Sequence, residues 1–143
     1  MRYLLDVNVL IALIDPAHVQ HDRAHLWFGK SGKIAWATCP LTENGVLRIV
    51  GHPRYPNSPG TPAAVAELMA RLLALPGHEF WPDGVSLLDS QRINGARLLE
   101  SAQVTDSYIL ALAVAHRGQL ATFDQNLIPD AVVDGQQALH LIP

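Results

Sequence analysis

The chain has 143 residues, 49% of them hydrophobic, which is typical of one globular domain with a substantial core. No apolar run is long enough to cross a bilayer, and a net charge of -3 excludes the strongly basic composition of a typical nucleic-acid-binding protein. The single cysteine, Cys39, cannot form an internal disulfide, and the N-terminus does not resemble a signal peptide. We therefore expect a cytoplasmic protein with no membrane association.

Strands and helices are predicted to alternate from the first residues onward. A strand over Arg2–Leu5 precedes a helix over Asn8–Ile14, which Pro16 stops. An amphipathic helix over His18–Gly29, a strand over Lys33–Ala37 and a helix over Pro40–Gly51 follow.

The proline-rich segment His52–Pro62 predicts an irregular loop. The next helix should have Thr61 as its N-cap and Pro62 as its first residue, and its apolar residues recur at helical spacing as far as Leu73. The remaining predictions are strands over Glu79–Pro82, Gln119–Phe123 and Ala138–Ile142, a short helix over Asn94–Glu100 and a buried helix over Thr105–Gly118.

This alternation predicts an α/β fold over a single domain, residues 1–143, built as a three-layer α/β/α sandwich with a central, mainly parallel sheet. Strands buried on both faces explain why the predicted strand segments are apolar rather than alternating. In such a sheet the ligand site lies outside the carboxyl ends of the strands. Acidic residues at that edge are the candidates for chemistry.

Four acids stand in apolar sequence at junctions between elements: Asp6, Glu43, Asp106 and Asp124. Two of them follow predicted strands and two lie in first turns of predicted helices, and both places face the carboxyl edge of the sheet. Carboxylates that meet there repel each other unless a cation compensates them. Oxygen ligands favour Mg²⁺ or Mn²⁺, and such a site is typical of phosphodiester chemistry.

Each acid also has a purely structural interpretation. Asp6 could cap the following helix, Glu43 and Asp106 could interact with helix dipoles, and Asp124 could form a turn. Capping alone does not explain why all four should occupy the same edge of one sheet.

With their contexts, "LLDVNVLIAL", "LTENGVLRI", "VTDSYILALA" and "LATFD", the four acids resemble the PIN domain, in particular VapC-type toxins of bacterial toxin–antitoxin pairs. The resemblance extends over essentially the full chain. It implies a Mg²⁺- or Mn²⁺-dependent endoribonuclease that cuts structured RNA, such as tRNA or rRNA. It also implies a homodimer and a small cognate antitoxin protein whose tail lies in a groove beside the first helices.

The resemblance assigns the quartet to metal binding and catalysis, and it implies supporting roles for neighbouring polar residues. Asn8 would orient metal-bound water, and Thr105 and Ser107 flank the third acid. Asn126 stands where some relatives have a further polar or acidic ligand, so a fifth carboxylate is absent here. Trp27 and Phe28 could line the antitoxin groove or simply pack in the core.

Basic and histidine residues leave further alternatives open. Arg48, Arg54 and Tyr55 could hold RNA phosphates and stack a base, or belong to a solvated surface. A histidine series on one predicted helix could bind zinc, but an exposed polar face is the preferred interpretation; its members are His18, His21 and His25.

Two other function classes compete with the nuclease. One is a PIN-like module that binds RNA or protein without catalysis. The other is a Mg²⁺-dependent phosphohydrolase of the haloacid-dehalogenase type, which is disfavoured because Asn8 replaces its second aspartate and the only lysines, Lys30 and Lys33, come early in the chain.

Overall fold

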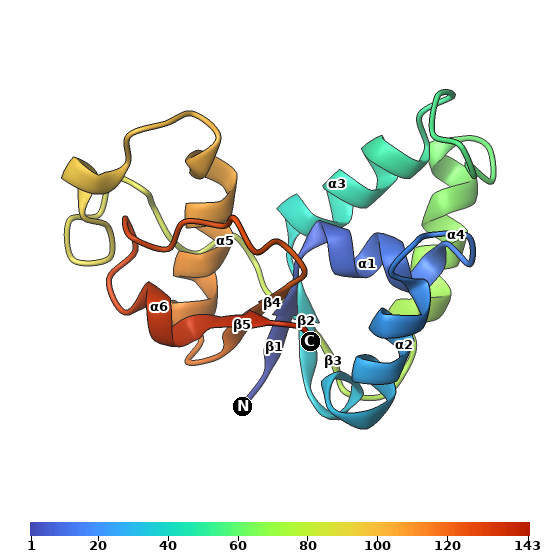
Figure 1. The fold of residues 1–143 in the computed structure, drawn as a ribbon, viewed down its shortest axis with the longest axis horizontal. Helices are drawn as coiled ribbons and strands as arrows, with labels where there is room; N and C mark the ends of the chain where they lie inside the picture. The colour runs from blue at the N-terminus through green and yellow to red at the C-terminus, as the bar shows by residue number, and fades with distance from the viewer.

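The computed structural model describes residues 1–143 and shows five parallel strands in the order β3-β2-β1-β4-β5. Helices cover both faces of this sheet, with α1–α4 on one side and α5 and α6 on the other (Figure 1). The strands are β1 (Tyr3–Leu5), β2 (Trp36–Thr38), β3 (His78–Phe80), β4 (Gln119–Thr122) and β5 (Leu139–Leu141). The predicted α/β/α sandwich with a parallel sheet is confirmed.

The helices follow the predicted alternation. They are α1 (Val7–Ile14), α2 (His21–Lys30), α3 (Pro40–Val50), α4 (Pro62–Leu73), α5 (Gln103–Ala115) and α6 (Gly135–Ala138). The predicted start of α4 is confirmed, because the Thr61 side chain accepts a hydrogen bond from the Ala64 amide and Pro62 is the first helical residue. No helix of the structure is both long and apolar enough to serve as a membrane span.

Two apolar clusters hold the three layers together. One lies between the sheet and α1–α4 and includes Leu5, Val9 and the fully buried Trp36. The other lies beneath α5 and includes Leu4 and Leu110. Because neighbouring residues of β1 point to opposite clusters, the strand is apolar throughout, as expected for a central parallel strand.

One predicted strand begins later than expected and one predicted helix is wrong. The strand predicted over Lys33–Ala37 is β2, but it runs over Trp36–Thr38, and the residues before it form a 3-10 turn, Gly32–Ile34. The predicted helix Asn94–Glu100 contains only the 3-10 turn Gly95–Arg97.

The physical reason for the second error is a contact with a distant segment. Ile93 forms an antiparallel bridge with Val132, and the Asn94 amide donates to the Ala131 carbonyl at 2.8 Å. These bonds keep the chain extended where a helix would begin. The short α6 was missed, since four residues carry no helical periodicity.

Candidate functional site

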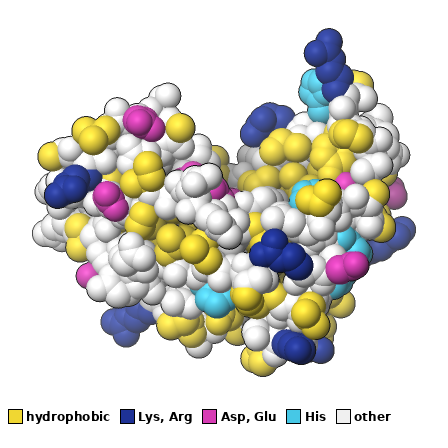
Figure 2. Space-filling model, in the orientation of Figure 1, with side chains coloured by type: hydrophobic (Ala, Val, Ile, Leu, Met, Phe, Trp, Pro, Cys, Tyr) yellow, Lys and Arg dark blue, Asp and Glu magenta, His cyan; other side chains and the backbone are white.

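Three of the four predicted acids gather at the carboxyl edge of the sheet. Asp6 follows β1, Asp124 follows β4, and Asp106 lies in the first turn of α5. In Figure 2 the surface is notched between the lobe of α5 and α6 and the lobe of α1–α4, and acidic side chains lie at the floor of this notch. Asp6, Asp106 and Asp124 are called the acidic cluster below.

Asp6 is the most buried member of the acidic cluster, with 7% of its surface exposed. It is the N-cap of α1: one carboxylate oxygen accepts from the Val7 amide at 2.7 Å. The other accepts from the Thr122 hydroxyl at 2.8 Å. Burial raises the pKa of Asp6; the hydrogen bonds from Thr122 and Val7 oppose this shift, and the charge of Asp124 adds to it.

Thr122, which the sequence analysis missed, organises the polar contacts of this edge. Its hydroxyl donates to Asp6 and accepts from the Asn8 side-chain amide at 3.0 Å and from the Asp124 backbone amide at 3.1 Å. The Asn8 side-chain oxygen in turn accepts from the Phe123 amide at 3.2 Å. One available signal was that Thr122 is a polar residue at the end of an apolar strand, directly before "FD".

The three carboxylates of the acidic cluster interact through their negative charges. The pKa of Asp106 is raised to about 6, first by burial and then by the negative charges of Asp6 and Asp124. Coupled carboxylates with oxygen donors alone match the ligand chemistry of a hard divalent cation such as Mg²⁺ or Mn²⁺. The residues present therefore fit such an ion by their chemistry. The side chains are not already drawn together around one, since no group of three or more His, Cys, Asp or Glu residues has a metal-holding geometry.

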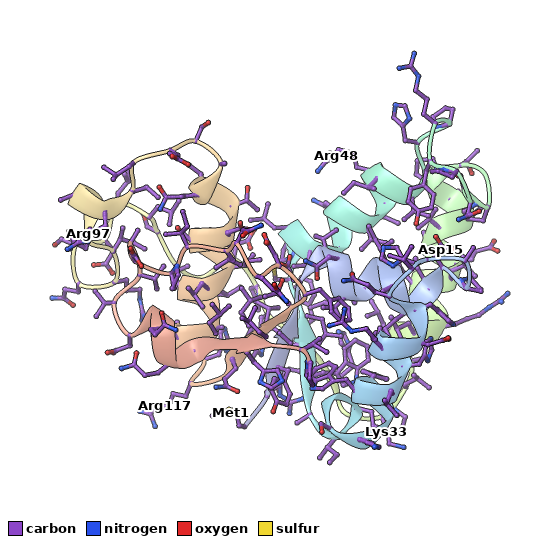
Figure 3. All side chains as sticks on the ribbon, viewed as in Figure 1. Met1, Asp15, Lys33, Arg48, Arg97 and Arg117 are labelled. Atoms are coloured by element: carbon purple, nitrogen blue, oxygen red, sulfur yellow. The ribbon has the colours of Figure 1, made fainter.

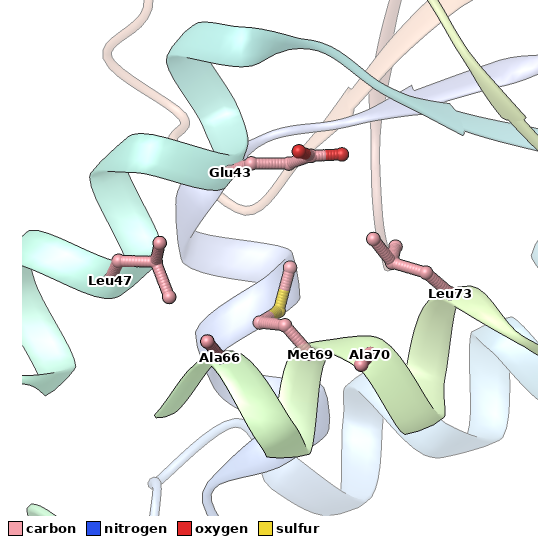
Figure 4. A pocket seen from close by; sticks show the side chains of 6 residues that line it. All are labelled: Glu43, Leu47, Ala66, Met69, Ala70 and Leu73. Carbon is pink, nitrogen blue, oxygen red and sulfur yellow. The ribbon is translucent and has the colours of Figure 1, made fainter. Parts of the chain in front are cut away.

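Glu43, the fourth predicted acid, is not joined to the acidic cluster. Its carboxylate accepts a hydrogen bond from the Thr38 hydroxyl at 2.6 Å. The charges that raise the pKa values of Asp6 and Asp106 are those of the acidic cluster itself. Figure 4 shows Glu43 at an otherwise apolar pocket between α3 and α4, which Leu47, Met69 and Leu73 help to line. The structure thus brings three of the four predicted acids together and leaves the fourth apart.

The packing of α3 explains why the Glu43 side chain points toward α4. Gly45 faces Val7 of α1 so closely that a Cβ at Gly45 would lie 2.8 Å from a Val7 methyl. Glu43 is two residues earlier, which is about 200° around the helix. The Glu43 side chain therefore leaves α3 on the side away from α1, toward α4.

The other predicted supporting residues differ in their surroundings. Ser107 is fully buried and its hydroxyl has no hydrogen-bond partner. Thr105 is exposed. Asn126 is exposed as well, and its backbone amide, rather than its side chain, donates to the Asp124 carboxylate at 2.8 Å.

The three predicted RNA-contacting residues separate into two kinds. Arg48 and Arg54 are exposed and form no ion pair. Arg48 projects from α3 on the side of the gap between the two lobes (Figure 3). Tyr55 instead donates its hydroxyl proton to the buried Asp15 carboxylate at 2.5 Å, so it ties the proline-rich loop to the end of α1.

Replacing Tyr55 by phenylalanine is expected to destabilise the fold by about 1–2 kcal/mol, because the buried Asp15 carboxylate loses a strong hydrogen bond. Burial alone would raise the pKa of Asp15, but hydrogen bonds from Tyr55, the Ala17 amide and Asn57 outweigh it and lower that pKa. The stabilisation by these hydrogen bonds is therefore fully present above the pKa that Asp15 has in the unfolded state. It is lost as the pH falls through the lower pKa that Asp15 has in the folded state.

Urea unfolding at pH 7 and near pH 3 checks this expectation. Tyr3→Phe is the matched control, because the Tyr3 hydroxyl has no hydrogen-bond partner within the protein. A Tyr55→Phe variant as stable as the control variant at pH 7, or a difference that does not shrink in acid, would contradict it.

The histidine series does not form a metal site. His21 donates to the Ala12 carbonyl at 2.7 Å and His25 to the Leu13 carbonyl at 2.9 Å, so both satisfy carbonyls near the end of α1. No metal-holding group is found among them. Trp27 and Phe28 are buried in the core beneath α1–α4, with 7% and 6% of their surfaces exposed.

Comparison with known proteins places these features in a family. The PIN domain family model matches residues 3–130. Ribonuclease VapC44 of Mycobacterium tuberculosis is 50% identical over 141 residues, which cover 99% of this chain and 98% of the relative. Ribonuclease VapC39 of the same organism is 40% identical over 131 residues, covering 92% and 94% of the two chains.

Two solved structures share the fold. The Mycobacterium tuberculosis toxin VapC20, described as cleaving the Sarcin-Ricin loop, superposes with a TM-score of 0.65 at 10% identity and covers 92% of this chain and 97% of its own. VapBC2 from Rickettsia felis, solved with a DNA fragment from its promoter, gives 0.60 at 12% identity, with coverage of 99% and 98%.

Proposed function

This chain belongs to the PIN domain family and within it to the VapC ribonucleases, and from that premise we propose that it is an endoribonuclease toxin that hydrolyses phosphodiester bonds in structured RNA. The observation that carries the proposal is the acidic cluster, three mutually coupled carboxylates at the carboxyl edge of a parallel sheet. Family membership also removes the haloacid-dehalogenase-type alternative.

We propose that the acidic cluster holds Mg²⁺ or Mn²⁺. When bound, the cation would offset the three negative charges, activate a water and stabilise charge that develops on the scissile phosphate. The chain's own contribution is positioning. Thr122 and the Val7 amide orient the two oxygens of Asp6, and the Asn8 side chain fixes Thr122.

The raised pKa of Asp106 gives this site a pH dependence. Below about pH 6 the Asp106 carboxyl holds a proton in the metal-free protein, and a protonated carboxyl is a poor ligand. Cation binding should therefore strengthen as the pH rises from 5 to 7.

The test incubates the purified full chain with structured RNA, tRNA or rRNA, with Mg²⁺, with Mn²⁺ and with EDTA. Cleavage that requires the cation and stops on chelation supports the proposal. RNA that is bound without metal and never cut would instead favour a non-catalytic module, and cleavage that continues in EDTA would contradict the metal site.

The partners follow from the same membership. We propose a cognate antitoxin protein, in line with the VapBC2 structure that shares this fold. We also propose a homodimer and a cytoplasmic location. Co-expression with a candidate antitoxin protein, followed by size-exclusion chromatography with light scattering, measures both assemblies. A chain that stays monomeric and binds no antitoxin would contradict this part.

Arg48 is expected to contribute to RNA binding rather than to chemistry. It is exposed, unpaired and directed toward the gap between the lobes, where an RNA backbone would approach a net-negative protein (Figure 3). Arg48→Ala should raise KM about three- to tenfold and leave kcat nearly unchanged, with a weaker dependence on salt.

Arg71→Ala is the matched control, because Arg71 is also exposed but lies in the last turn of α4. Steady-state kinetics at two salt concentrations provide the measurement. Equal KM values for the two variants would show that Arg48 does not contribute to RNA binding.

A further inference from the structure

The Arg23 side chain connects helix α2 to the two chain segments that leave the carboxyl ends of β4 and β5. Its Nη2 donates to the Ile142 carbonyl at 3.2 Å, and its Nε donates to the Pro143 carbonyl at 3.3 Å. The guanidinium carbon also lies 5.0 Å from the centroid of the Phe123 ring, within the range of a cation–π interaction. One exposed cation therefore contacts both segments from outside the core (Figure 1).

Phe123 lies between two residues that build the acidic cluster. It follows Thr122, whose hydroxyl donates to Asp6 at 2.8 Å, and it precedes Asp124. The Phe123 amide donates to the Asn8 side chain at 3.2 Å, and the Asp124 amide donates to the Thr122 hydroxyl at 3.1 Å. The position of Phe123 therefore affects where the Asp124 carboxylate lies relative to Asp6.

The segment that carries Asp124 belongs to no helix or strand. β4 ends at Thr122, and the next element, α6, begins at Gly135. A functional side chain on such a segment keeps its direction only if neighbouring groups hold the segment in place. The Phe123 ring is held in this way, because it is 8% exposed within the apolar cluster beneath α1–α4 and Arg23 covers it.

Strand β5 supplies a second connection between Arg23 and Thr122. The Ile142 amide donates to the Thr122 carbonyl at 3.0 Å, while the Ile142 carbonyl accepts from Arg23. Arg23 thus binds two residues that are both attached to Thr122, one by a peptide bond and one by a hydrogen bond. The planar guanidinium can face a ring and donate to two carbonyls at once, which the single ammonium of a lysine cannot do.

We propose that Arg23 is a positioning residue of the site, which holds the Phe123–Asp124 segment so that the Asp124 carboxylate faces the cation together with Asp6. The inference rests on the proposed function, because it assigns the acidic cluster to a cation. Arg23 forms no ion pair with the acids of the cluster, so it acts through Phe123. Mg²⁺ requires near-ideal octahedral geometry, and a loosely held ligand therefore weakens its binding.

The test measures Mn²⁺ binding by the full chain, using electron paramagnetic resonance of free Mn²⁺, together with steady-state RNA cleavage. Arg23→Met keeps an unbranched apolar stem over Phe123 but removes the charge and both donors. It should bind Mn²⁺ about three- to fivefold more weakly and lower kcat about tenfold, with KM for RNA unchanged. Lys30→Met is the matched control, because Lys30 is also an exposed cation of α2.

A double-mutant cycle tests whether Arg23 acts through the Phe123 ring. Phe123→Leu removes the ring but keeps a buried apolar side chain. In that background Arg23→Met should weaken Mn²⁺ binding by less than about twofold, because the contact that transmits its effect is already absent. Urea unfolding of the same variants separates positioning from stability, since a purely structural residue would change the free energy of unfolding and leave the Mn²⁺ affinity of the folded protein unchanged.

Hydrogen exchange in the metal-free protein follows the segment itself. The backbone amides of Phe123 and Asp124 donate to side chains of the site, so they report whether the segment opens. Both should exchange about tenfold faster in Arg23→Met than in the wild type, while the amides of α5 should exchange at the wild-type rate.

The outcomes separate this inference from the proposed function. Mn²⁺ affinity and kcat of Arg23→Met equal to those of Lys30→Met, or fully additive effects with Phe123→Leu, overturn the positioning role even if the wild type cleaves RNA with metal. A raised KM with unchanged kcat also overturns it, because Arg23 would then contact RNA. Absence of Mn²⁺ binding to the wild type, or equally tight binding by Asp6→Asn, overturns the proposed function and this inference with it.

Discussion

Replacing Asp6 by asparagine is expected to reduce RNA cleavage more than about a hundredfold while the fold remains intact. Asparagine is as good an N-cap as aspartate, so it can still accept from the Val7 amide and start α1. Its other terminal atom is an amide nitrogen, which cannot accept from Thr122, and the side chain carries no charge for the cation. The loss should therefore appear mainly in kcat and in metal binding rather than in stability.

Single-turnover cleavage with saturating Mg²⁺ and Mn²⁺ measures this loss, and circular dichroism checks the fold. Asp130→Asn is the matched control, since Asp130 is exposed and lies outside the acidic cluster. Cleavage by Asp6→Asn at the rate of the control variant would show that the buried carboxylate is only a helix cap.

The second large effect is expected at Asp106, where function and stability should change in opposite directions. Asp106→Asn should abolish cleavage to a similar degree, yet stabilise the metal-free protein at pH 7.5. The cause is repulsion: the pKa of Asp106 is raised to about 6 from 3.8 by burial and by the charges of Asp6 and Asp124, so its ionised form is disfavoured in the folded state. Removing that charge removes the unfavourable contribution.

The difference in pKa between the folded and unfolded states sets how stability depends on pH. A carboxyl with a higher pKa in the folded state lowers the free energy of unfolding once the pH rises above its pKa in the unfolded state. The destabilisation is complete above its pKa in the folded state. The shift to about 6 would represent roughly 3 kcal/mol for a fully buried group, and solvent screening at this half-buried side chain reduces the expected gain to about 1 kcal/mol. The gain should shrink as the pH falls from 6 toward 4.

Urea unfolding in EDTA at pH 7.5 and pH 4.5 provides the measurement. Addition of Mg²⁺ should stabilise the wild type and leave Asp106→Asn nearly unchanged, because only the wild type retains all three carboxylates of the acidic cluster. A variant less stable than the wild type in EDTA at pH 7.5 would contradict the repulsion between these acids.

The sequence alone predicts where the acidic cluster lies, for a simple physical reason. Alternating apolar segments imply a parallel sheet, and a parallel sheet brings strand ends and helix starts to one edge. Asp6, Asp106 and Asp124 occupy such junctions, so a pattern of local periods was enough to group residues more than 100 positions apart. Thr61 and Pro62 likewise marked the start of α4 through local capping chemistry.

Side-chain direction was decided only by tertiary packing. Periodicity placed Glu43 in the first turn of α3, but the contact of Gly45 with Val7 turned Glu43 toward α4 and Thr38. Tyr55 looked free to stack on RNA until the fold set its hydroxyl against Asp15, 40 residues away. Sequence spacing shows at which end of a helix or strand a residue lies. The direction of its side chain depends on how the element is rotated and on which side chains pack against it. Both are set by contacts between segments that are far apart in the sequence.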